Sequence, residues 1–224
     1  MFLLIRILTL IGNEKNNFRL KMTTKENVSR AEEKLAGAVR AFSFDFRGKT
    51  VLDIGSSTGG FTEFALRNGA KKVIAVEKGT NQMRAPLRFD SRVELLEKTD
   101  IFDVFLDTKI SVQENAKNVV LKEVPDVILA DVSFVSLKMV LAHAKRNLAG
   151  KETEFLVMLK PQFEAEEFQL NRGVVKNEKM RREIIKNYED WLKNNGFLVV
   201  NKRDNVLAGK NGNVERFYYL KPVK

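Results

Sequence analysis

Short apolar runs alternate with longer amphipathic segments along most of the chain. The apolar runs do not alternate with polar residues, which is typical of strands buried on both faces of a sheet. They occupy residues 50–54, 72–76, 93–96, 126–130, 155–159, 197–200 and 214–220. Segments with apolar residues at helical spacing lie between them, at residues 61–68, 137–148 and 177–194. The pattern predicts an α/β fold, with a mostly parallel seven-stranded sheet and helices on both faces.

Both ends of this pattern carry a further element. Ser29 and Glu32 resemble a capping box, and apolar residues at helical spacing follow as far as Phe42, so a helix is expected before the first strand. A loop with the sequence NVLAGKNGN separates the last two strands. It predicts a hairpin in which the last strand is antiparallel.

Residues 1–27 form an N-terminal extension to this pattern. Their apolar start is shorter than the roughly 20 residues of a membrane span, and Arg6 interrupts it. It also lacks the flanks of a signal peptide, so we expect a cytoplasmic protein with no membrane partner. An alternative is that the biological start is Met22, with the preceding residues poorly ordered.

The composition removes several classes of chemistry. A chain of 224 residues fits one domain, and it contains no cysteine and a single histidine, His143. Disulfide scaffolds, thiolate nucleophiles and zinc sites built from cysteine and histidine are therefore excluded, and no metal is predicted. We expect His143, within a predicted helix, to be structural.

The charge balance points to a polyanionic partner. There are 39 Lys and Arg residues against 29 Asp and Glu residues, a net charge of +10. Neutralisation of phosphates by Lys and Arg is the main source of nucleic-acid affinity, although a merely basic protein would show the same balance.

The first predicted strand runs into a glycine-rich turn, DIGSSTGGF, at residues 53–61. In an open α/β sheet, ligands bind outside the carboxyl ends of the strands, where glycine lets the backbone approach them. Glu77 ends the second strand, where a carboxylate can accept both hydroxyls of a ribose. A dinucleotide fingerprint requires glycine at the position of Ser57, so nicotinamide and flavin cofactors are disfavoured.

The acidic residues around this turn favour S-adenosyl-L-methionine, which carries an ammonium group, a ribose and an adenine but no phosphate. Asp53 is placed to meet the ammonium group, and Asp100, after the third strand, to meet the adenine amino group. The simpler alternative is a tight turn without a ligand. The predicted cofactor-binding residues are Asp53, Gly55, Ser56, Ser57, Thr58, Gly59, Gly60, Phe61, Glu77, Asp100 and Asp131.

Charged residues also lie at the ends of later strands. Asp131 and Lys160 each follow an apolar strand, Glu215 lies in the last strand and Lys34 lies on the first helix. Capping, a solvated loop charge or a lysine stem packed on apolar surface would explain each residue separately. As a set they can form a Lys-Asp-Lys-Glu cluster beside the ligand crevice.

This cluster suits methylation of a ribose hydroxyl. Methylation at a pyrimidine ring carbon generally uses a cysteine, and amino-group methylation an Asn/Asp-Pro-Pro-aromatic motif, and the chain has neither. A hydroxyl needs only in-line positioning and a base. A lysine amine can act as that base where burial and positive neighbours disfavour its protonated form.

Four blocks, GKTVLDIGSSTGGFTEFALRNGA, ILADVSFVSLK, LKPQFEA and GNVERFYYL, resemble the FtsJ-like methyltransferase superfamily, most closely its TlyA branch. The resemblance assigns residues 28–224 to a methyltransferase domain of Rossmann-like fold. It implies S-adenosylmethionine-dependent 2′-O-methylation of ribose in ribosomal RNA. The catalytic tetrad of the superfamily carries over onto Lys34, Asp131, Lys160 and Glu215, with Lys160 as the base.

The chain differs from the TlyA branch in the part that binds RNA. Members of that branch carry an S4-type RNA-binding domain before the methyltransferase domain. Only 27 residues precede Val28 here, so we expect the chain's own basic surface to hold ribosomal RNA or a ribosomal subunit, through Arg30, Arg172 and Lys176. Two alternatives stay open. One is a methyltransferase acting on a small molecule or another substrate, and the other is a non-catalytic RNA-binding or hemolysin-type protein.

Overall fold

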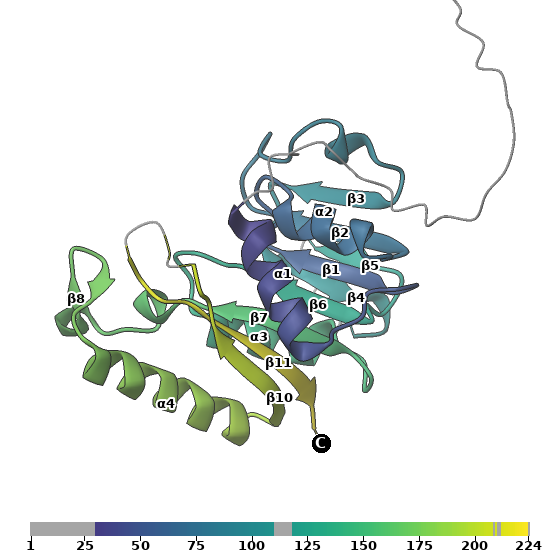
Figure 1. Ribbon diagram of the computed structural model, residues 1–224. Helices are drawn as coiled ribbons and strands as arrows, with labels where there is room; N and C mark the ends of the chain where they lie inside the picture. Colours follow the sequence, from purple (N-terminus) through teal and green to yellow (C-terminus); the bar gives the residue numbers. More distant parts are fainter. Residues whose placement is uncertain (1–29, 110–117, 208, 210–211, 224) are drawn as a thin grey trace, which may run out of the picture.

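A seven-stranded sheet in the order β10-β11-β7-β6-β1-β2-β3 runs through the centre of the molecule (Figure 1). The computed structural model describes residues 30–109, 118–207, 209 and 212–223. The strands are β1 (Thr50–Ile54), β2 (Lys72–Glu77), β3 (Val93–Glu97), β6 (Val127–Ala130), β7 (Glu154–Leu159), β10 (Phe197–Asp204) and β11 (Arg216–Pro222).

The directions of the strands confirm the predicted α/β architecture. The pairs β1–β2, β1–β6, β2–β3 and β6–β7 are parallel. Strand β11 is inserted between β7 and β10 and is antiparallel to both. The last strand is therefore the antiparallel one, as the loop before it predicts.

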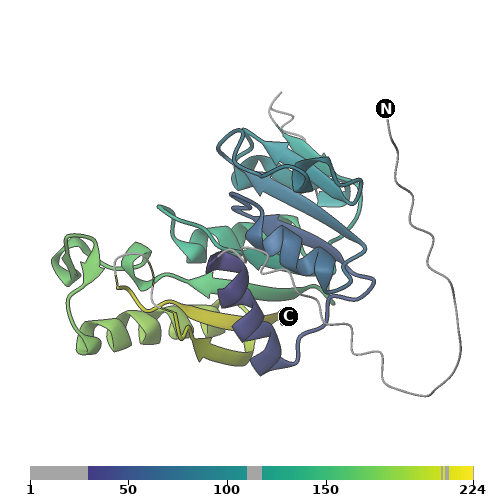
Figure 2. The ribbon, with the colours of Figure 1, turned by 45° about the horizontal axis from the view of Figure 1, so that its top comes forward.

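Helices cover both faces of the sheet, as Figures 1 and 2 show. On one face, α1 (Arg30–Phe42) and α2 (Gly60–Arg67) pack on alternate strand residues such as Val51 and Val73. On the other, α3 (Leu137–Asn147) and α4 (Glu178–Asn194) pack on residues such as Leu52 and Ile74. Strands buried on both sides explain why their sequences are continuously apolar.

Several small elements were not predicted. They are the strands β4 (Val104–Leu106), β5 (Val119–Leu121), β8 (Leu170–Asn171) and β9 (Val174–Val175), and the 3-10 helices η1 (Leu87–Phe89), η2 (Ile101–Asp103), η3 (Asp107–Lys109), η4 (Pro161–Phe163) and η5 (Glu167–Gln169). Segments of two or three residues are too short to show a period. The β8–β9 hairpin turns through Arg172 and Gly173, both with positive φ.

The predicted boundaries differ from the observed ones by a few residues. Strand β10 continues to Asp204, because its outer residues are exposed and polar and therefore do not extend the apolar run. Asn177 is not in α4 but caps it, accepting a hydrogen bond from the Met180 N–H. The expected cap at Ser29 and the extension over residues 1–27 lie outside the described residues. No helix in the described ranges is long and apolar enough to cross a membrane.

The strand order brings distant parts of the chain to one edge of the sheet. The chain passes outward from β1 to β3 and then returns to β6 on the other side of β1. Ligand crevices of α/β sheets lie at such a reversal, outside the carboxyl ends of the strands. Because β11 is antiparallel to β7, its beginning lies at this same edge, where Arg216 pairs with Leu159.

Candidate active site

The glycine-rich turn joins β1 to α2 at the carboxyl edge. Gly55, Ser57 and Gly59 all have positive φ, and this tight backbone leads directly into the helix. A Cβ added to Gly55 would lie 3.1 Å from the backbone oxygen of Asp131. Glycine at this position therefore lets the turn lie directly against the end of β6.

A cavity of about 650 Å³ opens beside this turn. Carboxylates of Glu77, Asp100 and Asp131 stand in its wall, with apolar surface from residues such as Val76 and Ile101. Lys78 is the one basic side chain among the described residues that line it. The cavity therefore suits a ligand with hydroxyl, amino or cationic groups on an apolar body.

Backbone N–H groups hold the Glu77 carboxylate in place. Its Oε2 accepts a hydrogen bond from the Ser57 N–H at 2.9 Å, and its Oε1 accepts one from the Gly79 N–H at 2.7 Å. The amide of Gln82 adds a third donor, 3.1 Å from Oε1. Each carboxylate oxygen can accept more than one hydrogen bond, so Glu77 is oriented and still able to accept from a ligand.

Asp100 is a second carboxylate in the cavity wall, at the start of η2. Its Oδ1 accepts from the Phe102 N–H at 3.2 Å, and its Oδ2 accepts from the Lys78 ammonium at 2.9 Å. Partial burial raises the pKa of Asp100, but these two donors outweigh it and leave the pKa below its usual value. Asp100 is therefore ionised at neutral pH.

Asp53 lies beneath the cavity rather than in its wall. It is fully buried, and its Oδ2 accepts from the Thr62 hydroxyl at 2.7 Å, while its Oδ1 has no partner. Burial, with smaller contributions from Asp131 and Glu77, raises its pKa to about 7. The hydroxyl of Ser56 is likewise buried without a partner.

The predicted cofactor residues thus divide into two groups. Those that line the cavity are Gly55, Ser57, Glu77, Asp100 and Asp131. Those that build the turn beneath or behind it are Asp53, Ser56, Thr58, Gly59, Gly60 and Phe61. Spacing alone does not separate the two groups, because alternate residues of β1 and the turn face opposite sides of the sheet.

Lys160 contacts Asp131, one of the residues in the cavity wall. The Lys160 Nζ lies 2.7 Å from Asp131 Oδ1 and donates a hydrogen bond of 2.8 Å to the Ser133 hydroxyl. Both side chains are largely shielded, with exposed fractions of 12% and 20%. Ser133 was not singled out from the sequence, although it lies two residues after Asp131 in the same motif.

Lys34 and Glu215 form a second ion pair, between α1 and the residue before β11. This pair is more deeply buried, with exposed fractions of 10% and 6%. Asn205, which sequence reasoning missed, donates through its side chain to Glu215 at 3.3 Å. The register of β11 on β7 places Glu215 beside Lys160. All four residues of the predicted cluster therefore reach the same edge of the sheet.

The residues predicted to contact RNA do not gather at one place. Arg172 and Lys176 lie together on the β8–β9 hairpin, where the Lys176 ammonium donates to the Phe168 carbonyl at 2.5 Å. Arg30 begins α1, and Figures 1 and 2 both show the hairpin well apart from this helix.

His143 packs inside the fold and does not face the cavity. Its Nε2 lies 2.9 Å from the Val104 carbonyl oxygen, and burial lowers its pKa. Within the ranges that the structure describes, no group of three or more potential ligand residues could hold a metal ion.

Solved structures support the fold. A Lactococcus lactis protein assigned to the hemolysins superposes with a TM-score of 0.77 and 34% identity, over 87% of this chain and 88% of that one. A Listeria monocytogenes protein assigned as an S-adenosylmethionine-dependent methyltransferase superposes with a TM-score of 0.56 at 18% identity, over 85% of this chain and 100% of that one. The second match is one of fold alone, and it confirms the Rossmann-like methyltransferase architecture.

Sequence comparisons identify the family. Hemolysin A of Brachyspira hyodysenteriae is 36% identical over 189 residues, which are 84% of this chain and 74% of the relative. The 23S rRNA (cytidine-2′-O)-methyltransferase TlyA of Campylobacter jejuni is 33% identical over 206 residues, 91% of this chain and 74% of the relative. The model of the FtsJ-like methyltransferases matches residues 27–221. The chain is thus a member of the FtsJ-like methyltransferase family.

Proposed function

We propose that this protein transfers a methyl group from S-adenosylmethionine to the 2′-hydroxyl of a ribose in ribosomal RNA. The observation that carries the proposal is the position of Lys160 against Asp131 and Ser133, two residues in the wall of an acidic cavity. A lysine amine beside a methyl donor is the group that methylation of a hydroxyl requires. The Campylobacter relative, named for cytidine 2′-O-methylation of 23S rRNA, supports the same reaction and substrate.

The cavity wall suits the proposed methyl donor. Glu77, already oriented by backbone N–H groups, would accept hydrogen bonds from the ribose hydroxyls, and Asp100 from the adenine amino group. The unpartnered Oδ1 of Asp53 and the buried Ser56 hydroxyl lie under the turn, toward the amino-acid end of the donor. Among the charged residues of this wall, three carboxylates stand against one lysine, which fits a donor with ammonium and sulfonium charges and no phosphate.

The reaction divides among the four cluster residues. S-adenosylmethionine, when bound, supplies an electrophilic methyl group on a positively charged sulfur. Lys160 in its unprotonated form accepts the proton of the 2′-hydroxyl as the ribose oxygen bonds to the methyl carbon. The methyl–sulfur bond breaks at the same time, and its electron pair stays on the sulfur, which leaves as a neutral thioether. Asp131 fixes the Lys160 amine, while Lys34 and Glu215 order the surrounding edge. Much of the rate enhancement comes from holding the hydroxyl in line with the methyl group.

Transfer of a labelled methyl group tests this function. Wild type and Lys160→Ala would be compared on naked rRNA, ribosomal subunits and free nucleosides. We expect RNA labelling to fall by about 10²- to 10⁴-fold in the variant, the usual contribution of a general base. The product should be a 2′-O-methylated nucleotide, which resists alkaline cleavage of the RNA.

Lys151→Ala is the matched control, because Lys151 is an exposed lysine in the turn before β7. RNA labelling that survives Lys160→Ala would rule out Lys160 as the base. A methyl group found on a nucleobase, or equal labelling of free nucleosides, would instead rule out 2′-O-methylation of RNA.

A further inference from the structure

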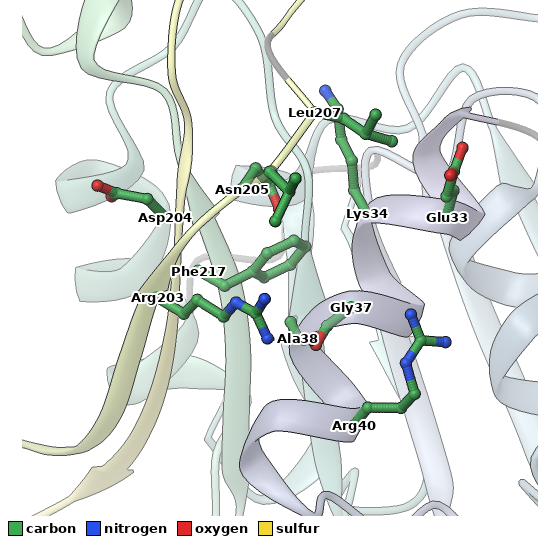
Figure 3. Close-up of a pocket in the computed structure, with 11 residues that line it drawn as sticks. Glu33, Lys34, Gly37, Ala38, Arg40, Arg203, Asp204, Asn205, Leu207 and Phe217 are labelled. Atoms are coloured by element: carbon green, nitrogen blue, oxygen red, sulfur yellow. Dashed lines mark hydrogen bonds between the residues drawn. The ribbon is translucent and has the colours of Figure 1, made fainter.

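A second pocket, of about 310 Å³, lies next to the Lys34–Glu215 pair, between α1 and the end of β10. One wall is α1, including Lys34, Gly37 and Arg40. The other is formed by residues 203–207 with the ring of Phe217. We call it the arginine pocket, after Arg40 and Arg203 (Figure 3).

The two arginines lack carboxylate partners. In the described parts of the chain, neither guanidinium forms an ion pair, and the polar contact of Arg203 is a long one, 3.5 Å to the Gly37 carbonyl oxygen. Asp204, the neighbour of Arg203, instead pairs with Arg181 and Arg216. In Figure 3, Arg203 points toward α1 whereas Asp204 points away from the pocket. Glu33 is the other carboxylate in the lining, and against the two guanidiniums it leaves an excess of one positive charge once the paired Lys34 and Asp204 are set aside.

Gly37 leaves the helix side of the pocket open. A glycine inside a helix costs about 1 kcal/mol relative to alanine. The cost has no steric explanation within the described chain, because a Cβ at this position would meet nothing within 4 Å. The missing side chain instead gives access to the floor between the two arginines.

We infer that the arginine pocket binds a phosphodiester of the substrate strand, an inference that rests on the proposed RNA substrate. Guanidinium groups match phosphate oxygens in charge and geometry. Arg40 lies six residues from Lys34, about 9 Å along α1. At about 3.4 Å per phosphate in a stacked strand, about three nucleotides would span the distance from Arg40 to the level of Lys34.

The position of the pocket also explains how the strand is directed. Lys34 belongs both to its wall and to the ion pair beside Lys160, so the pocket continues from the reacting edge. A strand held by Arg40 and Arg203 would run along α1, with its target ribose reaching Lys160. Arg40 and Arg203 are therefore positioning residues and take no part in the chemistry.

Arg40→Gln, Arg203→Gln and the double variant test this inference in the full chain. We expect the Kd for a short single-stranded oligoribonucleotide to rise about tenfold for each arginine, the loss expected for one charged hydrogen-bonding contact. The slope of log Kd against log salt concentration should fall by about one for each. The KM for RNA should rise while kcat stays within about twofold, because the chemical step is untouched.

Arg146→Gln is the matched control, an exposed arginine near the end of α3 on the other face of the sheet. A second pair of variants probes the space itself. Gly37→Leu should weaken RNA binding by filling the pocket, whereas Gly37→Ala should leave it nearly unchanged.

Unaltered Kd and salt slope in the double arginine variant would overturn the inference, as would a fall in kcat with unchanged KM. Binding is measured without turnover, so the proposed function is tested separately. If the arginine variants weaken RNA binding but the methyl group is found on a nucleobase, phosphate binding by the pocket is supported and methylation of the ribose is refuted.

Discussion

The cavity beside the glycine-rich turn and the arginine pocket both lie toward the carboxyl edge of the sheet but differ in charge. Three carboxylates stand in the wall of the cavity, and the one lysine among its described lining residues is paired with Asp100. In the arginine pocket, two guanidiniums lack carboxylate partners and the neighbouring Asp204 points away. A cationic small molecule and a polyanionic strand can thus be bound side by side without competing for the same surface.

The two lysine–carboxylate pairs lie between these regions. A pair of opposite charges adds little net charge, so it separates the negative cavity from the positive pocket. The Lys160–Asp131 pair opens on the cavity, whereas the Lys34–Glu215 pair is more deeply buried and contributes to the arginine pocket. The difference fits the roles proposed above, with Lys160 in the chemistry and Lys34 and Glu215 ordering the edge.

The largest effect is expected from Asp53, because this carboxyl is completely buried and one of its oxygens has no hydrogen-bond partner. Its pKa is about 7 in the folded protein against 3.8 for the free side chain. The folded state therefore keeps a proton that the unfolded chain releases as pH rises from 4 to 7, and stability falls over this range. The loss amounts to roughly 4 kcal/mol at pH values above both pKa values.

Urea unfolding of wild type and Asp53→Asn across this pH range measures the effect. The fall in stability should be strongly reduced in the variant, while Asp107→Asn, a change at an exposed aspartate, should behave as wild type. An identical pH dependence in Asp53→Asn would show that this carboxyl does not carry the effect.

The variant Glu77→Gln tests directly whether the cavity and the arginine pocket bind their ligands independently. Loss of the negative charge should weaken S-adenosylmethionine binding about tenfold, because hydrogen bonds to a charged acceptor become neutral ones. Its affinity for RNA should not change. Calorimetric titration with each ligand, beside the exposed control Glu183→Gln, gives both values. An equal loss of RNA affinity would mean that the two regions are coupled.

Salt concentration should change the affinity for RNA more than the affinity for S-adenosylmethionine, and this effect is smaller than the two above. A fourfold rise in salt concentration weakens RNA binding by about threefold for each phosphate contact. Binding of S-adenosylmethionine should change much less, because the shielded groups around the cavity are screened less than surface charges. Parallel titrations at several salt concentrations test this difference. An affinity for RNA that does not change with salt concentration would favour a small-molecule substrate instead.

Local patterns were sufficient to predict the sheet and the four residues at its edge. Apolar runs located the strands, and a charged residue directly after a strand is carried to the carboxyl edge whatever its neighbours are, as for Asp131 and Lys160. Lys34 and Glu215 were singled out on the first helix and in the last strand, where no strand end fixes their position. The register of β11 explains the position of Glu215, and the ion pair with Lys34 joins α1 to the same edge.

The remaining features depend on tertiary structure. The depth of Asp53 follows from the packing of α2 on β1, which its spacing to Gly55 does not reveal. The arginine pocket joins residues as far apart as Gly37 and Arg203, separated by 166 positions. Neither arginine belongs to a motif, so no local signal connects them.

The position of β11 in the sheet also has a consequence for how the protein is made. Lys34 and Glu215 are 181 residues apart, and β11 must insert between β7 and β10 before they can meet. Contacts of such long sequence separation form late, after the entropy of closing the chain has been lost. A nascent chain that has been synthesised as far as β7 already contains every described residue of the cavity wall. It acquires the complete reactive edge only once its last strand has been synthesised.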